Sequence, residues 1–394
     1  MTTRKSAFMA LSLFLLAMAF WARPAEIAAA PEYGNPVVGG PPQAVEDRFV
    51  PEPGEYAVET WVEGLEVPWS LVFLTGDRAL VTERPGRVRL IEKGHLRNEP
   101  YAVIDGVVHT GEGGLMGIAK HPGYPGEPWL YLMHTYREDG NLYNRVVRYA
   151  DTGKGMEFDR VIIGGIPGNR VHDGGRIAFG PDGMLYVTTG DVWQARVAQD
   201  PESLGGKILR LAPDGSIPPD NPFAAGSPVY SLGHRNPQGL AWHPETGDLF
   251  SSEHGPSGEF GLRGRDIINV IEAGGNYGWP LMLGDADVEG FMDPLVMWER
   301  ATPPAGMAFW DGRLFVATLR SRALVRIGLE TPGEGYRVTD IDRLFARGPS
   351  EGLYGRLRDA VAGPDGALYV LTSNRDGRGS PAPGDDRILR ITVR

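Results

Sequence analysis

The sequence predicts an all-β fold, a six-bladed β-propeller, and three observations carry this prediction. Glycine and proline are abundant, at 55 and 33 of 394 residues without a collagen period, so the chain turns often and favours short strands over long helices. One short strand pattern recurs six times. The six copies stand 50 to 65 residues apart, which is the spacing expected of propeller blades with several short strands each.

The recurring pattern is a glycine-containing turn followed by Leu, an aromatic or aliphatic residue, and Val or a small residue. A strand-like run precedes each copy, and a strand of basic and β-branched residues follows it. The repeated leucines are Leu80, Leu130, Leu185, Leu249, Leu314 and Leu368. The later strands are expected at 87–90, 145–148, 207–210, 267–270, 324–327 and 388–391.

The ring of blades is expected to close through residues near 56–63, which would supply the outer strand of the last blade. The alternative fold is a β-sandwich or a pair of smaller all-β domains. The even spacing of the repeat along the whole chain argues against both. The propeller domain is therefore expected to span residues 54–394, preceded by a Pro/Gly-rich linker at 31–53.

The N-terminal segment has the composition of a secretory signal. Arg4 and Lys5 precede an apolar run over 7–21, and an A-x-A tripeptide follows at 28–30. Residues 1–30 are therefore predicted to direct export, to the periplasm or the extracellular space. The alternative is that the segment is retained as an N-terminal membrane anchor. No membrane span is expected in the mature domain.

Composition excludes several classes of function. The chain has no cysteine, so it has no disulfide, no Cys-ligated zinc, no Fe–S cluster and no Cys nucleophile. Its net charge of −11 argues against nucleic acid as the main partner. A monomer is the default expectation.

Polar residues that flank the inner strands of a propeller surround its central channel, and two such segments precede predicted inner strands. The glycine-rich segment 111–117 lacks the βαβ context of a dinucleotide loop, so its glycines are expected to let the backbone approach a ligand or the channel. In the segment 171–176, His172 suits a general base because an imidazole titrates near neutral pH. A purely structural histidine is the alternative.

Three further segments carry candidate ligand-binding groups. Residues 233–239 concentrate hydrogen-bonding side chains that are costly to bury without a ligand or a network. The bend at Gly255–Pro256 follows the inner strand of the same blade and leaves carbonyls for a hard cation such as Ca²⁺, or is simply a turn. Arg320 and the pair Arg356 and Arg358 form a local anion site or are solvated surface arginines; alternation puts Arg356 and Arg358 on one face if their segment is extended.

Together these segments resemble the soluble PQQ-dependent aldose sugar dehydrogenases of the glucose/sorbosone dehydrogenase family. The resemblance covers about residues 55–394. It rests on the runs His-Arg-Asn-Pro-Gln-Gly-Leu at 234–240 and Gly-Gly-Asn-Tyr-Gly-Trp-Pro at 274–280, with Gly-Pro at 255–256 and Arg-x-Arg at 356–358 in the matching order. The family fold is a six-bladed propeller, in agreement with the repeat.

The resemblance implies a specific reaction, the oxidation of an aldose at C1 to the lactone with hydride transfer to PQQ. It implies that His172 is the general base and that Arg235 stabilises charge on the cofactor. It also implies a Ca²⁺ ion that is held by the carbonyls of Gly255 and Pro256. The further residues that it implies for cofactor binding are Glu112, Asn236, Arg320, Arg356 and Arg358.

Some positions depart from the glucose dehydrogenase pattern, among them Glu112, Val171 and Ile267, and these departures favour a broad range of aldoses. The electron acceptor is not identified by the sequence. One alternative function is a Ca²⁺-dependent propeller hydrolase of the lactonase type. It would recruit the carboxylates Glu83, Glu112, Asp191 and Glu253. The other alternative is a non-catalytic propeller that binds a partner on one face.

Overall fold

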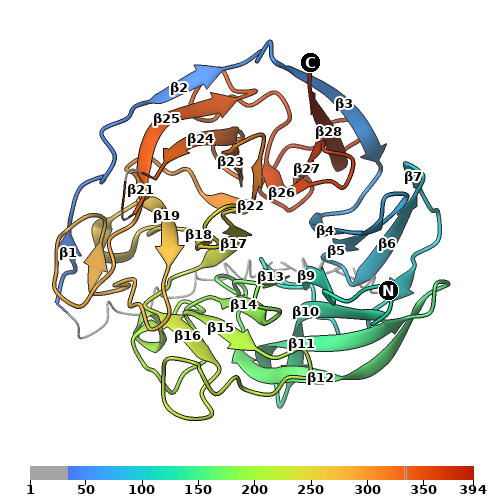
Figure 1. Ribbon diagram of the computed structural model, residues 1–394, viewed down its shortest axis with the longest axis horizontal. Coiled ribbons are helices and arrows are strands. Elements are labelled where there is room, and N and C mark those ends of the chain that lie inside the picture. The colour runs from blue at the N-terminus through green and yellow to red at the C-terminus, as the bar shows by residue number, and fades with distance from the viewer. Residues whose placement is uncertain (1–33, 332, 334) are drawn as a thin grey trace, which may run out of the picture. The chain divides into compact units, whose positions relative to one another are not determined.

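The computed structural model describes residues 34–331, 333 and 335–394, and the predicted signal segment 1–30 lies outside them. Within the described residues, six sheets of four or five strands are arranged radially around a common centre (Figure 1). The innermost strand of each sheet is called the first strand of its blade. The six-bladed propeller predicted from the repeat is confirmed. No helix in this part of the chain has the length and apolar character needed to cross a membrane.

Blades I to III are antiparallel sheets that follow one another along the chain. Blade I contains β4 (Pro68–Thr75), β5 (Arg78–Glu83), β6 (Arg87–Glu92), β7 (His95–Leu96) and β8 (Ala102–Val103). Blade II contains β9 (Leu115–Lys120), β10 (Trp129–Glu138), β11 (Asn141–Asp151) and β12 (Met156–Pro167). Blade III contains β13 (Ile177–Phe179), β14 (Leu185–Thr189), β15 (Lys207–Leu211) and β16 (Val229–Leu232).

Blades IV to VI complete the ring. Blade IV contains β17 (Pro237–Trp242), β18 (Leu249–Glu253), β19 (Asp266–Ile271) and β21 (Val296–Trp298). Blade V contains β22 (Pro304–Trp310), β23 (Arg313–Thr318), β24 (Leu324–Glu330) and β25 (Arg337–Leu344). Blade VI contains β26 (Leu357–Ala362), β27 (Leu368–Thr372), β28 (Arg387–Val393) and, as its outer strand, β3 (Tyr56–Glu63). The antiparallel pairing of β3 with β28 closes the ring as predicted.

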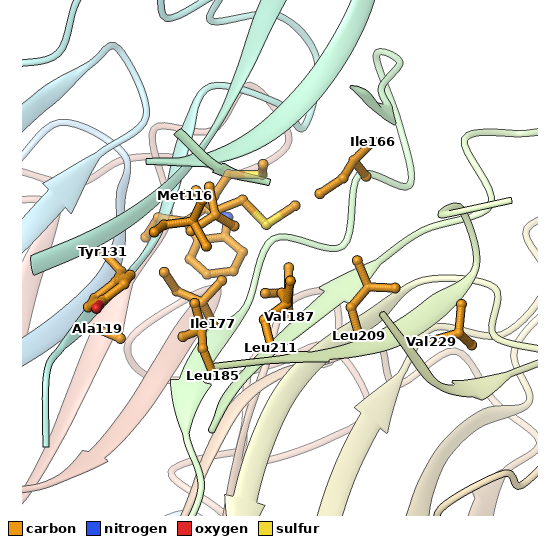
Figure 2. Close-up of a cluster of buried hydrophobic side chains, with 14 of the residues drawn as sticks. Met116, Ala119, Tyr131, Ile166, Ile177, Leu185, Val187, Leu209, Leu211 and Val229 are labelled. Carbon is orange, nitrogen blue, oxygen red and sulfur yellow. The ribbon is translucent and has the colours of Figure 1, made fainter. Parts of the chain in front are cut away.

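The six repeated leucines lie in the second strand of each blade, and their side chains are at most 4% exposed. Stacked blades cover both faces of these strands, which explains why the pattern is nearly continuous in apolar residues rather than alternating. A separate hydrophobic cluster fills each of the six interfaces between neighbouring blades. Figure 2 shows the cluster between blades II and III, where Met116 and Tyr131 meet Ile177 and Leu185.

The stretch that composition predicted as a linker carries two strands that pair with the propeller. Strand β1 (Val37–Val38) pairs in parallel with β20 (Met282–Leu283), and β2 (Asp47–Val50) pairs in parallel with β25 as a fifth strand of blade V. The part of the stretch that the structure describes is therefore attached to blades IV and V. Two 3₁₀ turns, η1 (Ala195–Ala198) and η2 (Glu259–Gly261), lie in the loops after β14 and β18.

One arginine, Arg176, bonds to the first strands of three other blades. The Arg176 guanidinium donates hydrogen bonds to Ser70 Oγ (3.0 Å), to an Asp359 carboxylate oxygen (2.9 Å) and to the Gln238 carbonyl (3.1 Å). These partners belong to blades I, VI and IV, so one side chain from blade III ties four blades together. Its guanidinium also lies over the Trp69 ring, 4.4 Å from the centroid.

Candidate active site

The loops that enter the first strands and leave the second strands line a cavity of about 1230 Å³, counting its solvent-open mouth. In an antiparallel pair the start of one strand lies beside the end of the next, so these loops gather at one end of the ring. Loops of blades II to VI contribute to the wall. Seven of the nine residues predicted for the site line this cavity, namely Glu112, His172, Arg235, Gly255, Pro256, Arg320 and Arg356.

The imidazole of His172 is held by a carboxylate and leaves one nitrogen available. Its Nδ1 lies 2.6 Å from Asp191 Oδ1, and its ring lies against Trp193 at a 30° tilt, with centroids 4.9 Å apart. Its Nε2 has no hydrogen-bond partner among the described residues. A carboxylate on Nδ1 places the proton there and leaves the Nε2 lone pair free, which is the state that a general base needs.

The carboxylate that orients His172 is itself fixed. Asp191 Oδ2 accepts a hydrogen bond from Trp279 Nε1 (2.8 Å), and Oδ1 accepts one from the Trp193 backbone N–H (2.9 Å). Burial by itself would raise the pKa of Asp191, but the His172 imidazole outweighs burial and holds this pKa below its ordinary value. Asp191 is therefore ionised and able to stabilise an imidazolium.

The backbone of His172 is left-handed, with a φ of 59°, and two neighbouring segments hold it. Its N–H donates to Glu112 Oε2 (3.0 Å). A Cβ at Gly190 would lie 1.8 Å from the His172 carbonyl oxygen, so only glycine allows this approach. Gly111 likewise lets the Glu112 loop approach the Arg170 carbonyl. The glycines of 111–117 therefore serve close packing against neighbouring loops.

Arg235 lies in the cavity wall with its charge paired. Its Nε and Nη2 donate to Glu259 Oε1 at 2.9 and 2.7 Å, and its guanidinium lies over the Trp279 ring. Burial alone would raise the pKa of Glu259, and the Arg235 charge instead holds it below its ordinary value. Arg235 is only 2% exposed, so its charge acts in a poorly hydrated environment where electrostatic interactions are strong.

The arginines predicted as an anion site differ in their surroundings. Arg320 is exposed at the mouth and makes no hydrogen bond or ion pair with the described residues. Arg356 pairs with Asp376 (Nη2 to Oδ2, 2.7 Å). Arg358 lies behind the wall, where its Nη1 donates to Gln238 Oε1 and its buried Nε has no partner. Burial lowers the pKa of Arg358 to about 9.

Two of the predicted residues are therefore placed behind the cavity wall. Arg356 precedes β26, and the register of that strand shifts between Leu357 and Asp359, so the regular alternation on which a shared face for Arg356 and Arg358 depended is interrupted. Asn236 is completely buried. Its Oδ1 accepts hydrogen bonds from the Gly174 N–H and from Gln238 Nε2, and its Nδ2 contacts His254.

The Gly255–Pro256 bend presents oxygen ligands to the cavity. It follows β18, the second strand of blade IV, and not the innermost strand as expected. The Gly255 carbonyl accepts no hydrogen bond from the described residues, whereas the Pro256 carbonyl accepts one from the Gly264 N–H (3.1 Å). Asp266 fixes the bend by accepting the Gly255 N–H (3.0 Å).

The chain matches the family model described as glucose/sorbosone dehydrogenase over residues 65–389. It belongs to this family. Aldose sugar dehydrogenase YliI of Escherichia coli K12 is 32% identical over 360 residues, which cover 82% of this chain and 92% of that protein. An uncharacterized protein of Synechocystis is 31% identical over 389 residues, which cover 88% and 90% of the two chains.

Two solved structures resemble this member of the glucose/sorbosone dehydrogenase family closely. A Thermus thermophilus protein described as an oxidoreductase (glucose dehydrogenase) is 52% identical with a TM-score of 0.80, over 86% of this chain and all of that one. The PQQ-bound aldose sugar dehydrogenase of Streptomyces coelicolor is 39% identical with a TM-score of 0.75, over 87% and 99% of the two chains. The family assignment makes the chain an oxidoreductase of the sugar dehydrogenase type.

Sequence reasoning missed the partners of the site residues in this family member. Asp191 was considered only as a metal ligand, and Glu259, Asp376 and Arg378 were not considered. One signal was present for Asp191, because His172 and Asp191 are 19 residues apart, as are His234 and Glu253 in the next repeat. The ion pair between Glu112 and Arg378 joins residues 266 positions apart and left no local signal.

Proposed function

We propose that this protein oxidises the C1 hydroxyl of a broad range of aldose sugars to the lactone, with PQQ as the hydride acceptor and Ca²⁺ as its metal partner. The observation that carries the proposal is the His172–Asp191 pair, whose free Nε2 stands at a cavity bordered by arginines. The proposal includes export, which the N-terminal sequence supports, and a small-molecule aldose substrate, which the family supports. It further includes a monomer and a separate electron acceptor.

The residues present fit a cofactor that carries several carboxylates. Arg320 lines the cavity without an anionic partner, and the buried Arg358 Nε has none either. Arg320 is exposed at the mouth and available to an anion, and a buried N–H without a partner, such as Arg358 Nε, is costly, so a carboxylate that reached either group would be bound strongly. Arg356 lines the cavity and would add a third cation. The Streptomyces coelicolor relative, whose structure is described as PQQ-bound, supports PQQ as that cofactor.

The Gly255–Pro256 bend fits a hard cation. Ca²⁺ prefers oxygen ligands, among them backbone carbonyls, and the Gly255 carbonyl accepts no hydrogen bond within the described chain. The Pro256 carbonyl keeps one lone pair beyond its bond to the Gly264 N–H. Both residues line the same cavity as Arg235 and His172, so a cation held there would share the site with the cofactor.

In this mechanism His172 Nε2 accepts the proton of the C1 hydroxyl, and Asp191 stabilises the imidazolium that forms. The chemistry that PQQ supplies when bound is acceptance of the hydride from C1, made easier by the Ca²⁺ charge. Arg235 stabilises negative charge that develops next to it, because its guanidinium is already oriented by Glu259 and needs little reorganisation.

The lactonase alternative would need carboxylates that are free to converge on a metal. In the structure each of the four is engaged elsewhere: Glu83 with Arg87 and Arg89, Glu112 with Arg378, Asp191 with His172, and Glu253 with His234. Among the residues that the structure describes, no three acidic or histidine side chains gather as a metal site would require. These contacts favour the dehydrogenase.

Reconstitution tests the proposal. Residues 31–394 are purified without cofactor, PQQ and Ca²⁺ are added singly and together, and dye reduction is followed with several aldoses. Activity is expected only with both additions. His172→Ala is expected to lower kcat at least ~100-fold, the low end for loss of a general base.

The exposed His95, in β7 of blade I, provides a control, since His95→Ala should leave kcat unchanged. A wild-type protein that does not bind PQQ at micromolar cofactor would refute the proposal. Lactone hydrolysis in the presence of Ca²⁺ would then be the next assay.

A further inference from the structure

An ion pair at the rim of the cavity joins two loops from different blades. Arg378, in the loop between β27 and β28 of blade VI, places its Nη1 2.6 Å from Glu112 Oε1, in the loop that enters blade II. We propose that Arg378 is a positioning residue for the reaction, which acts through Glu112 to hold His172 in the geometry of a general base. The inference rests on the proposed function, because it assigns His172 that role.

The two carboxylate oxygens of Glu112 accept hydrogen bonds from different partners. Oε1 accepts from Arg378, and Oε2 accepts the backbone N–H of His172 (3.0 Å). Because the His172 backbone is left-handed, it needs external contacts to stay in that conformation. The carboxylate supplies one on the N–H side, while the His172 carbonyl accepts the Val192 N–H (3.3 Å). Fixing Glu112 therefore fixes the point from which the imidazole projects.

Arg378 is in turn tied to a predicted cofactor arginine. Its own N–H donates to Asp376 Oδ1 (2.9 Å), and Asp376 Oδ2 pairs with Arg356 at 2.7 Å. A continuous chain of polar contacts thus runs from His172 through Glu112, Arg378 and Asp376 to Arg356. The loop after β27 therefore connects His172 to Arg356, which is proposed to bind the cofactor.

Arg378 also sets the charge around the base. Burial by itself would raise the pKa of Glu112, but the positive charge of Arg378 first, then the imidazoles of His172 and His254 and the His172 N–H, bring it to about 2. Glu112 is therefore ionised, and Arg378 neutralises a negative charge close to His172. The groups that act on Glu112 are Arg84, His172, Asp173, His254, Arg358 and Arg378. His172 also faces Asp191 and His254.

A role in stability alone does not explain this arrangement. The Arg378 side chain is 55% exposed and that of Glu112 20%, and ion pairs that reach the surface contribute little to folding. Arg378→Ala is therefore expected to lower Tm by less than about 3 °C. Its effect should fall on kcat instead, with a loss of about 10-fold, because displacement of a catalytic group costs rate rather than stability.

The test compares Arg378→Ala, Arg378→Lys and Arg375→Ala in the purified protein, with PQQ affinity measured by titration. We expect Arg378→Ala to lower kcat about 10-fold and to move the acidic limb of the kcat/KM profile to higher pH, since an unneutralised Glu112 favours the imidazolium. Arg378→Lys should restore part of kcat. Arg375→Ala is the matched control in the same loop, because its side chain contacts only the Asp385 carbonyl, and it should behave as wild type.

A double-mutant cycle shows whether Arg378 acts through Glu112. In a Glu112→Gln background, the further change Arg378→Ala is expected to have little effect on kcat. A full 10-fold loss in that background would overturn the proposal. So would an Arg378→Ala variant that binds PQQ at least 10-fold more weakly with an unchanged pH profile, because Arg378 would then be a cofactor ligand.

A measurement without cofactor separates this inference from the proposed function. The protein has eight histidines, so a histidine-labelled sample gives a sparse NMR spectrum in which His172 is assigned by its loss in His172→Gln. The titration midpoint of His172 is expected to rise by at least ~0.5 pH unit in Arg378→Ala. An unchanged midpoint would overturn the inference even if the enzyme proved PQQ-dependent. A raised midpoint in a protein without dehydrogenase activity would instead leave the contact network intact and refute the proposed function.

Discussion

Two histidine–carboxylate pairs stand at equivalent places in neighbouring blades, and only one of them faces the cavity. His172 precedes β13 and contacts Asp191 after β14, at 2.6 Å; His234 precedes β17 and contacts Glu253 at the end of β18, at 2.8 Å. In both pairs Nδ1 is the contacting atom and the separation is 19 residues. Each carboxylate also accepts a backbone N–H, from Trp193 in blade III and from Arg235 in blade IV.

The difference lies at the other ring nitrogen. His234 Nε2 is bonded to Ser231 Oγ (2.8 Å), its ring stacks on Tyr277, and its side chain is fully buried. His172 Nε2 has no partner in the described chain and borders the cavity. The same unit of the repeat is therefore a closed structural contact in blade IV and an available proton acceptor in blade III. What separates the two roles is the access to Nε2, since both carboxylate contacts are alike.

The largest expected effect is that of changing the carboxylate in the cavity pair. Asp191→Asn removes the charge that stabilises an imidazolium and can turn the imidazole to the wrong tautomer, so kcat should fall at least ~100-fold with little change in Tm. The matched change in the other pair, Glu253→Gln, should lower Tm and leave kcat within a few-fold. Steady-state kinetics and thermal unfolding of both variants measure this. Equal losses of kcat in the two variants would contradict the division of roles.

The free energy of unfolding at low pH should depend on the ionisation of Glu112, which lines the cavity. The pKa of Glu112 lies at about 2 in the folded protein, below its ordinary value of 4.5. A depressed pKa stabilises the fold above the unfolded-state pKa, and this contribution is lost as pH falls from about 5 towards 2. It is at most about 3 kcal/mol. Glu112→Gln should therefore lose less stability over that range than wild type, as measured by denaturant unfolding at pH 6, 4 and 3; parallel curves would show that Glu112 contributes nothing.

The repeat made the fold predictable because the second strand of every blade needs the same apolar residues. A second strand covered on both faces needs Leu, an aromatic residue and Val in the same order, and this requirement is local in sequence. The fold class and the ring closure through β3 could therefore be predicted, whereas the roles expected for the cavity residues came from the family resemblance. The polar segments before the first strands also indicated which end of the ring holds the candidate site, because these segments lie together there.

The contacts that determine the chemistry could not be predicted in the same way. Alternation would put Arg356 and Arg358 on one face of an extended segment, but the register of β26 shifts between Leu357 and Asp359. Asn236 stays a prediction as a cofactor-binding residue, but its bonds to the Gly174 N–H and to Gln238 could not be predicted. Strand periodicity cannot report a bulge or the far partner of an ion pair, because both are set by contacts between blades. Strands β1 and β2 escaped detection for the same reason, because their partners β20 and β25 lie more than 240 residues further along the chain.

The smallest effect is expected from Ser231→Ala. This variant tests whether the access of Nε2 to the cavity is the only difference between His172 and His234. Ser231→Ala frees Nε2 of His234 but leaves it buried away from the cavity, so no new base is created. The lost hydrogen bond should cost about 1 kcal/mol, or more if Nε2 stays without a partner. Thermal unfolding should show a lower Tm, while kcat and its pH profile should match wild type. A shifted pH profile would mean that the two pairs are coupled through Arg235, whose backbone contacts Glu253 and whose side chain lines the cavity with His172. Access to Nε2 would then not be enough to explain why His172 is the proposed general base and His234 is a structural residue.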